Sequence, residues 1–273
     1  MKIQLFDTHT HFDVPDFDSD REQLAYAAKQ VGVEKLILIG FLQQRFQDML
    51  NTHHFLNGLN EAPQSLLAPG LHPFYIEQHS AEHLSSLEQL LQAEDCVAIG
   101  EIGLDTFLPE HKEPVVLKKQ KDFFSAQLEM AEQYTKPVLL HIRKSHADVL
   151  ALLKKHHFKN GGIAHAFSGG VEEAKAFIRA GFKIGVTGQI TNPNARKLHT
   201  VVQAVGVEHL VLETDCPDMT PLCCQRSDQH RTRNTPANLP FVLDGLAQSL
   251  QMDREQLAYK LWENSHNVLN LKI

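Results

Sequence analysis

The chain has 273 residues, which we expect to form a single domain over 1–273. Its formal net charge of −7 argues against a general affinity for polyanions, so nucleic-acid binding would need a local basic patch. The sequence contains no apolar stretch of the roughly 20 residues that span a bilayer, and its N-terminus lacks the apolar core of a signal peptide. We therefore expect a cytoplasmic protein without membrane contacts.

Short apolar runs alternate with longer amphipathic segments along the chain. In chain order, the predicted strands span 3–7, 35–39, 66–69, 96–100, 137–141, 162–165, 182–185 and 209–213. Apolar residues at helical spacing separate most of them, for example Leu84, Leu87, Leu90 and Leu91 before the fourth strand and Val116, Leu117, Phe124, Leu128 and Ala131 before the fifth. The pattern predicts two further helices over 194–205 and 235–250, and an extra C-terminal helix over 253–269.

Repeated strand-then-helix units indicate a parallel sheet, because parallel strands need crossover connections. Eight such units favour closure into a barrel over an open doubly wound sheet. The open sheet would be expected to carry a glycine-rich G-x-G-x-x-G turn after an early strand, and the sequence has none there. We therefore predict an α/β protein, a (β/α)8 TIM barrel with an additional C-terminal helix.

Histidines and carboxylates follow five of the eight predicted strands. The first strand ends in Asp7-Thr8-His9-Thr10-His11, where residues two apart on an extended segment face the same side. The other four positions are Glu101, His141, His165 and Asp215, which follow the fourth, fifth, sixth and eighth strands. Catalytic groups of such barrels lie at the C-terminal strand ends, so these side chains are candidate site residues.

Imidazole and carboxylate groups are ligands for zinc, manganese or iron. Six such groups exceed the needs of one tetrahedral ion and suit two divalent ions about 3.5–4 Å apart. We predict zinc or manganese, with magnesium as an alternative, and assign Glu101 as the bridging ligand because it lies mid-order around the barrel. A metal-bound hydroxide would be the nucleophile, and Asp215 would bind metal and accept a proton from the attacking water.

Each of these residues also has a structural interpretation. A histidine at a strand end is often a hydrogen-bonded structural residue, Glu101 could be a salt-bridge partner in the core, and Asp215 could cap the following turn. Their coincidence at one end of a single barrel favours the metal site.

Further polar residues lie close to these strand ends. Arg226, Arg231 and Arg233 follow the eighth strand, where barrel loops often bind phosphate, although a solvated basic loop is the alternative. His72 could contact substrate, orient a ligand or make a structural hydrogen bond. Asp105 could hold a ligand histidine by a hydrogen bond or cap a turn.

Six motifs occur in order along the chain. They are D-T-H-T-H-F-D from Asp7, G-L-H-P from Gly70, G-E-I-G-L-D from Gly100, L-H-I-R from Leu140, H-A-F-S-G from His165 and E-T-D-C-P from Glu213. Together they resemble the signatures of the TatD-type metal-dependent deoxyribonucleases, and the similarity is greatest to the YjjV-like bacterial branch. The resemblance implies a divalent-metal phosphodiesterase on a TIM barrel, with the six ligands assigned above.

The chain departs from the usual family pattern at three positions. Ala166 replaces a common cysteine, Cys216 replaces a common serine, and Thr235 replaces an acidic residue in the loop after the eighth strand. These differences leave the predicted ligands intact and bear on the choice of substrate.

The leading functional hypothesis is phosphodiester hydrolysis, with DNA as the substrate because of the resemblance. DNA ends or short single strands suit a net-acidic protein better than long duplex, whose binding depends mainly on phosphate neutralisation. The alternative is hydrolysis of an amide, ester or lactone at the same ions, which would not require the arginines. A barrel kept only as a scaffold would be expected to lose ligands, yet every ligand type is present. We expect no obligate protein partner.

Overall fold

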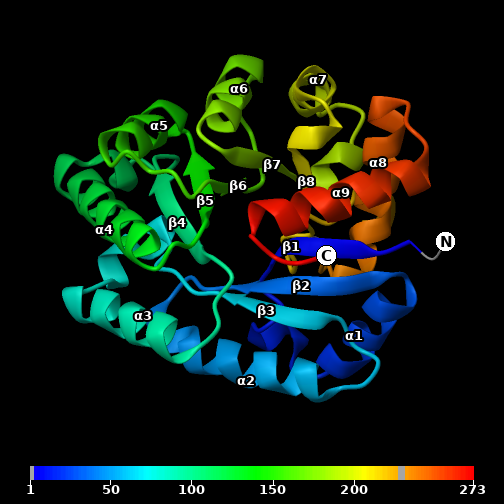
Figure 1. Ribbon diagram of the computed structural model, residues 1–273, viewed down its shortest axis with the longest axis horizontal. Helices are drawn as coiled ribbons and strands as arrows, with labels where there is room; N and C mark the ends of the chain where they lie inside the picture. The colour runs from blue at the N-terminus through cyan, green and yellow to red at the C-terminus, as the bar shows by residue number, and fades with distance from the viewer. Residues whose placement is uncertain (1–2, 227–230) are drawn as a thin grey trace.

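The computed structural model describes residues 3–226 and 231–273, and over these residues eight strands alternate with helices around a barrel (Figure 1). The strands are β1 Leu5–Thr10, β2 Val33–Ile39, β3 Gln64–Ala68, β4 Ile99–Asp105, β5 Val138–Arg143, β6 Gly162–Ala164, β7 Phe182–Val186 and β8 Leu210–Leu212. The helices are α1 Arg21–Gln30, α2 Phe46–Gly58, α3 Ala81–Ala93, α4 Pro114–Gln133, α5 His146–Lys155, α6 Val171–Arg179, α7 Arg196–Val205, α8 Leu239–Leu250 and α9 Arg254–Val268. None of the helices described is long and apolar enough to cross a membrane.

The barrel consists of two parallel sheets that meet at two seams. One sheet has the order β1-β2-β3 and the other runs from β4 to β8 in sequence order. At the first seam the Val97 amide donates to the Leu67 carbonyl at 2.9 Å, and at the second the Thr8 hydroxyl donates to the Leu212 carbonyl at 2.9 Å. These contacts close the ring, so the predicted (β/α)8 barrel is confirmed.

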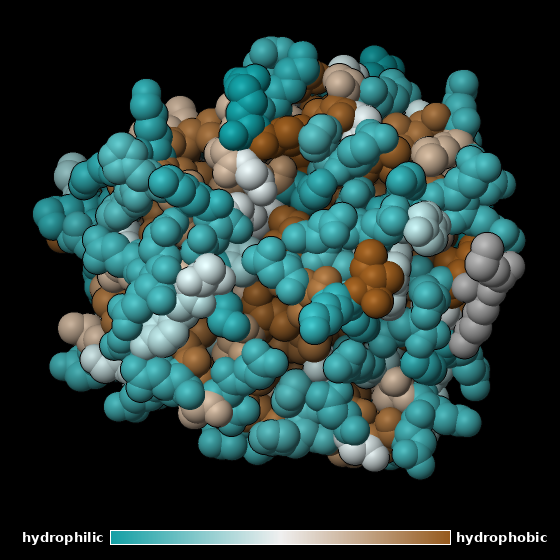
Figure 2. All heavy atoms as spheres, viewed as in Figure 1, coloured by the Kyte–Doolittle hydropathy of each residue, from teal (hydrophilic) through white to brown (hydrophobic). Residues whose placement is uncertain are grey.

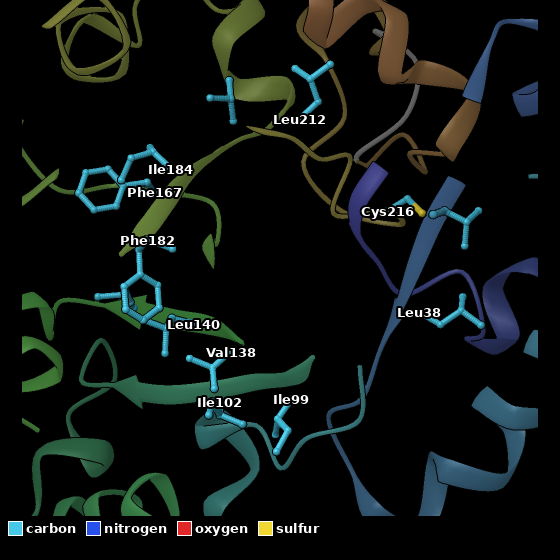
Figure 3. Packing of buried hydrophobic residues seen from close by; sticks show 14 of the residues in the cluster. Leu38, Ile99, Ile102, Val138, Leu140, Phe167, Phe182, Ile184, Leu212 and Cys216 are labelled. Atoms are coloured by element: carbon cyan, nitrogen blue, oxygen red, sulfur yellow. The ribbon is translucent and has the colours of Figure 1, made fainter. Parts of the chain in front are cut away.

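Both faces of the strands are buried, and alternate residues serve different layers. In β2, Leu36 and Leu38 join the large cluster that packs between the strands and the helices, whereas Ile37 and Ile39 join a smaller cluster inside the barrel. Figure 3 shows labelled members of the large cluster on strands from several sides of the barrel. Burial on both faces explains why the strands read as continuous apolar runs rather than as alternating patterns.

The extra helix α9 closes the N-terminal end of the barrel. Its Trp262, together with Leu269 just beyond it, belongs to the inner cluster, and Asn264 donates to the carbonyls of Val207 and Leu210 at 2.7 and 2.9 Å, where β8 begins. In Figure 1 α9 crosses in front of the strands, and the same face is mostly hydrophilic in Figure 2. The predicted C-terminal helix is therefore confirmed, and the C-terminal strand ends form the open mouth.

Two strands carry an irregularity just before the mouth. Over 7–10 strand β1 advances by three residues against two in β2, and over 99–102 strand β4 advances by three against two in β5. An extra residue of this kind bends the strand and changes the face to which nearby side chains point. These two segments contain His9 and Glu101.

We expect Phe124→Ala to lower the free energy of unfolding by about 3–5 kcal/mol, because Phe124 of α4 is 1% exposed and its loss leaves a cavity in the large cluster. Phe241→Ala on α8 is the matched control, since that ring is 42% exposed and its removal should cost less than about 1 kcal/mol. Urea unfolding monitored by circular dichroism measures both. Equal losses in the two variants would contradict the assignment of Phe124 to the core.

Candidate metal centre

The six predicted ligands converge at the open mouth of the barrel. A cavity of about 560 Å³ lies there, and its lining includes His11, Glu101, His141, His165 and Asp215. His9 lies beneath them and is fully buried. Side chains that are far apart in the sequence therefore meet in one place, as the strand-end argument requires.

Glu101 lies at the centre of the group. Its Oε2 is 3.2 Å from His9 Nε2 and 3.8 Å from His11 Nε2, whereas its Oε1 is 2.6 Å from His141 Nδ1. Burial opposes ionisation of Glu101, but the surrounding histidines, led by His72, outweigh it and hold the pKa well below its usual value. The ionised carboxylate thus directs one oxygen to each of two sets of imidazoles, which is the arrangement a bridging ligand needs.

Asp215 faces the same space from the end of β8. Its Oδ1 is 3.5 Å from His165 Nε2 and 3.8 Å from Nε2 of both His9 and His11. Burial raises the pKa of Asp215, but His165 and the other imidazoles outweigh that effect and lower it. An ionised carboxylate therefore stands opposite Glu101.

The residues present fit divalent metal ions. Among the described residues, three groups have ligand atoms within 4.8 Å of one another, namely His9, His11 and Asp215; His9, Glu101 and His165; and His72, Glu101 and His141. Both ring nitrogens of His9 and the Nδ1 of His11 are buried without a hydrogen-bond partner. Buried polar atoms without partners cost free energy, which cations bound to such nitrogens would recover.

Two of the histidines are oriented by carboxylates behind them. His165 Nδ1 is 3.0 Å from Glu213 Oε2, and His141 Nε2 is 2.9 Å from Asp105 Oδ2. Each ring therefore presents its other nitrogen to the centre, an arrangement typical of metal-binding histidines. Burial raises the pKa of Asp105, but the hydrogen bond and charge of His141, the Phe107 amide and Arg143 together outweigh burial and lower the pKa to about 2. Asp105 thus occupies the position of a carboxylate that holds a ligand histidine.

His72 lines the cavity and acts on Glu101. Its Nδ1 accepts the Phe74 amide at 2.9 Å, so the ring proton of neutral His72 lies on Nε2, 3.3 Å from Glu101 Oε1. Burial lowers the pKa of His72 to about 4, which keeps the ring neutral near pH 7. In this form His72 donates to Glu101 and fixes its orientation.

The structure does not gather the three predicted arginines. Arg231 lines the cavity and forms an ion pair with Asp218. Arg233 points elsewhere, because its guanidinium lies 4.9 Å from the ring centre of Phe17 and pairs with Asp20. Arg226 is absent from the cavity lining. Phosphate binding by these arginines therefore stays a prediction, and Arg231 is the one of the three that lines the cavity.

Sequence reasoning missed two residues that contribute to the site. Arg143 lines the cavity with its guanidinium 3.8 Å from the ring centre of Phe107. Glu213 is fully buried and orients His165. Arg143 lies in β5 two residues after His141, and Glu213 lies just after β8 two residues before Asp215. Residues two apart on an extended chain face the same side, and this period could have indicated both residues.

We predict that Glu213→Gln weakens divalent-metal affinity about 10- to 100-fold, because a neutral amide holds the Nδ1–H of His165 less strongly. Competition with a chromogenic chelator measures the affinity. Glu129→Gln on α4, where the side chain is 70% exposed, is the control that should bind metal like the unchanged chain. Unchanged affinity in the Glu213 variant would contradict its role.

Metal binding should also become tighter with rising pH. Burial lowers the pKa of His141, but Glu101 and Asp105 outweigh it and raise the pKa to about 9, so the metal-free ring is protonated near pH 7. A ligand nitrogen must be deprotonated, and each proton released changes the apparent affinity about tenfold per pH unit up to the raised pKa. Titration calorimetry in buffers of different ionisation enthalpy would detect this release, and a pH-independent affinity between pH 7 and 9 would contradict it.

Comparisons with known proteins point to one family. Residues 6–270 match the family model for TatD related DNase. The chain is 35% identical over 274 residues to the uncharacterized metal-dependent hydrolase YjjV of Escherichia coli K12, covering 99% of this chain and 100% of that one. The crystal structure of Escherichia coli YjjV matches with a TM-score of 0.88 and 32% identity over 100% of both chains.

A more distant relative carries a specific activity in its name. The 3′-5′ ssDNA/RNA exonuclease TatD of Pantoea vagans is 28% identical over 271 residues, covering 98% of this chain and 100% of that protein. The family model and the relatives span almost the full length of the chain, and the donor groups at the barrel mouth suit divalent metal. The chain therefore belongs to the TatD family of metal-dependent hydrolases.

Proposed function

We propose that the chain hydrolyses phosphodiester bonds in nucleic acid at a centre of two divalent ions. The observation that carries the proposal is the position of Glu101, which directs its two oxygens to two sets of imidazoles at the base of an open cavity. The exonuclease name of the Pantoea vagans relative supports nucleic acid as the substrate. Zinc or manganese suits the histidine-rich donor set best.

The chain's own residues have separable roles in this reaction. Bound ions would lower the pKa of water and offset negative charge on the phosphate. Asp215, an ionised carboxylate 3.5 Å from His165 Nε2, lies where it can accept the proton of the attacking water. Glu101 would bridge the ions while His72 holds its orientation.

The cavity rim supplies the contacts for the phosphate. Arg143 and Arg231 both line the cavity, and a guanidinium matches phosphate with paired donors. Five acidic side chains also line it, namely Asp16, Glu101, Asp105, Asp215 and Asp218. A cavity with this many acidic groups gives little phosphate neutralisation along a duplex, so DNA ends or short single strands are the substrates that it favours.

The alternative is hydrolysis of an amide, ester or lactone, whose carbonyl the same ions could polarise. The two arginines at the rim favour the phosphodiester, because an acyl substrate has no phosphate for them to bind. Turnover of the metal-loaded protein on short single-stranded oligonucleotides and on a lactone and ester panel separates the two. Activity confined to the acyl panel would overturn the proposal.

We expect Asp215→Asn to lower kcat on a single-stranded oligonucleotide about 100- to 10,000-fold, because the amide cannot accept the proton. Glu101→Gln should lose comparable activity, since a neutral amide cannot balance two cations. Asp122→Asn is the control, because that side chain is 59% exposed on α4 and has no role in the proposed site. Thermal melting shows whether each variant is folded, and folded variants with full activity would refute the assigned roles.

A further inference from the structure

A second cavity adjoins the metal cavity. It measures about 330 Å³ and shares three lining residues with the first, Ala166, Ser168 and Met219. The remaining walls come from the end of β7, from the segments after β6 and β7 and from the first turn of α7. A chain-like substrate held at the metal site could therefore continue into this hollow.

The charge of the second cavity is opposite to that of the first. Arg196 and Lys197 line it, and its lining among the described residues includes no aspartate or glutamate. Lys197 Nζ donates to the Ser168 carbonyl at 2.7 Å, which holds the ammonium at the boundary between the cavities. No ion pair is formed by Arg196 or Lys197 within the part of the chain that the structure describes, whereas Arg231 of the first cavity is paired with Asp218. The second cavity thus offers two cations without an ion-pair partner among the described residues, and the nearby Glu173 pairs with His146 at 3.9 Å.

The backbone at this position adds to the positive potential. Helix α7 begins at Arg196, and the residue before it, Ala195, provides no side-chain cap for the first amides. Both residues line the cavity, so the positive end of the helix dipole faces it. Two side-chain cations and an uncapped helix start together favour an anion of the phosphate type.

The other walls are suited to an uncharged ring. Phe167, Leu198 and Met219 contribute apolar side chains. A nucleotide combines an anionic phosphate with flat, mainly apolar surfaces, so the cavity matches both parts.

We propose that this second cavity binds the nucleotide next to the scissile phosphodiester, with Arg196 and Lys197 holding its phosphate. The inference rests on the proposed phosphodiesterase activity and extends it to a substrate class. That class is a single-stranded oligonucleotide with at least one phosphate beyond the bond that is cleaved.

The test compares two substrates that differ by one nucleotide and one phosphate. These are a thymidine dinucleotide with a single phosphodiester and the corresponding trinucleotide with two. We measure kcat/KM for both with the metal-loaded chain and with the double variant Arg196→Gln, Lys197→Gln. The ratio of trinucleotide to dinucleotide should fall about tenfold or more in the variant, because contacts to the additional phosphate are lost.

The control is Lys154→Gln, Lys155→Gln, which removes two exposed lysines at the C-terminal end of α5, away from the mouth. This variant has the same change in net charge and should keep the original ratio.

A binding measurement separates the subsite from turnover. In the Asp215→Asn background, anisotropy of a labelled six-nucleotide single strand at several salt concentrations gives the salt dependence of binding. The slope of log K against log salt is negative, and it should become less steep by about 0.7 for each phosphate contact removed by the double variant.

The outcomes are distinct. If the unchanged chain cleaves both oligonucleotides and the double variant keeps the ratio and the salt slope, the subsite is refuted while phosphodiester hydrolysis stands. If the unchanged chain cleaves neither oligonucleotide, the proposed function fails, and the subsite fails with it.

Discussion

The interaction on which the centre depends is the contact between one buried carboxylate, Glu101, and imidazoles that approach it from different strands. Burial alone would favour the neutral acid, yet the histidines around it keep the pKa of Glu101 low. The same crowding disfavours positive charge elsewhere, because burial and the neighbouring His165 lower the pKa of His9. The rings of these two histidines are stacked with centroids 3.4 Å apart. Without metal, the mouth therefore holds buried carboxylates and imidazoles whose pKa values are shifted by their close neighbours. Divalent cations would bind these groups together and balance their charge.

The sequence allowed much of the architecture to be predicted, because both strand faces of a parallel barrel are buried and each strand reads as a short apolar run. The sequence also allowed the prediction that six side chains meet at the mouth, because residues at the C-terminal ends of the strands lie there. The direction of those side chains was not accessible in the same way. The irregularities around His9 and Glu101 depend on pairing with neighbouring strands, and no local pattern marks them. The position of the Arg233 side chain was inaccessible for a similar reason, because its partners Asp20 and Phe17 are more than 200 residues away.

The two ends of the barrel differ in their side chains and in their expected roles. Helix α9 fills the N-terminal end with Trp262 and anchors it through Asn264, whereas the C-terminal end is left open and lined with ionisable groups. Apolar packing at the N-terminal end and around the strands supplies stability, whereas ionisable groups gather at the mouth. Substitutions near α9 are therefore expected to act on folding, and substitutions at the mouth on chemistry.

The division of the strands into two sheets has a mechanical consequence for the centre. Each of the three candidate ligand groups combines residues from the β1–β3 side with residues from the β4–β8 side. Ions held there would cross-link the two halves of the cylinder at its mouth, in addition to backbone hydrogen bonds such as Glu101 N–H to the Gly40 carbonyl and Asp215 N–H to the His9 carbonyl. The metal ions would then stabilise the barrel as well as take part in the reaction. Loss of metal would weaken the contacts between the two sheets before the helices separate from the barrel.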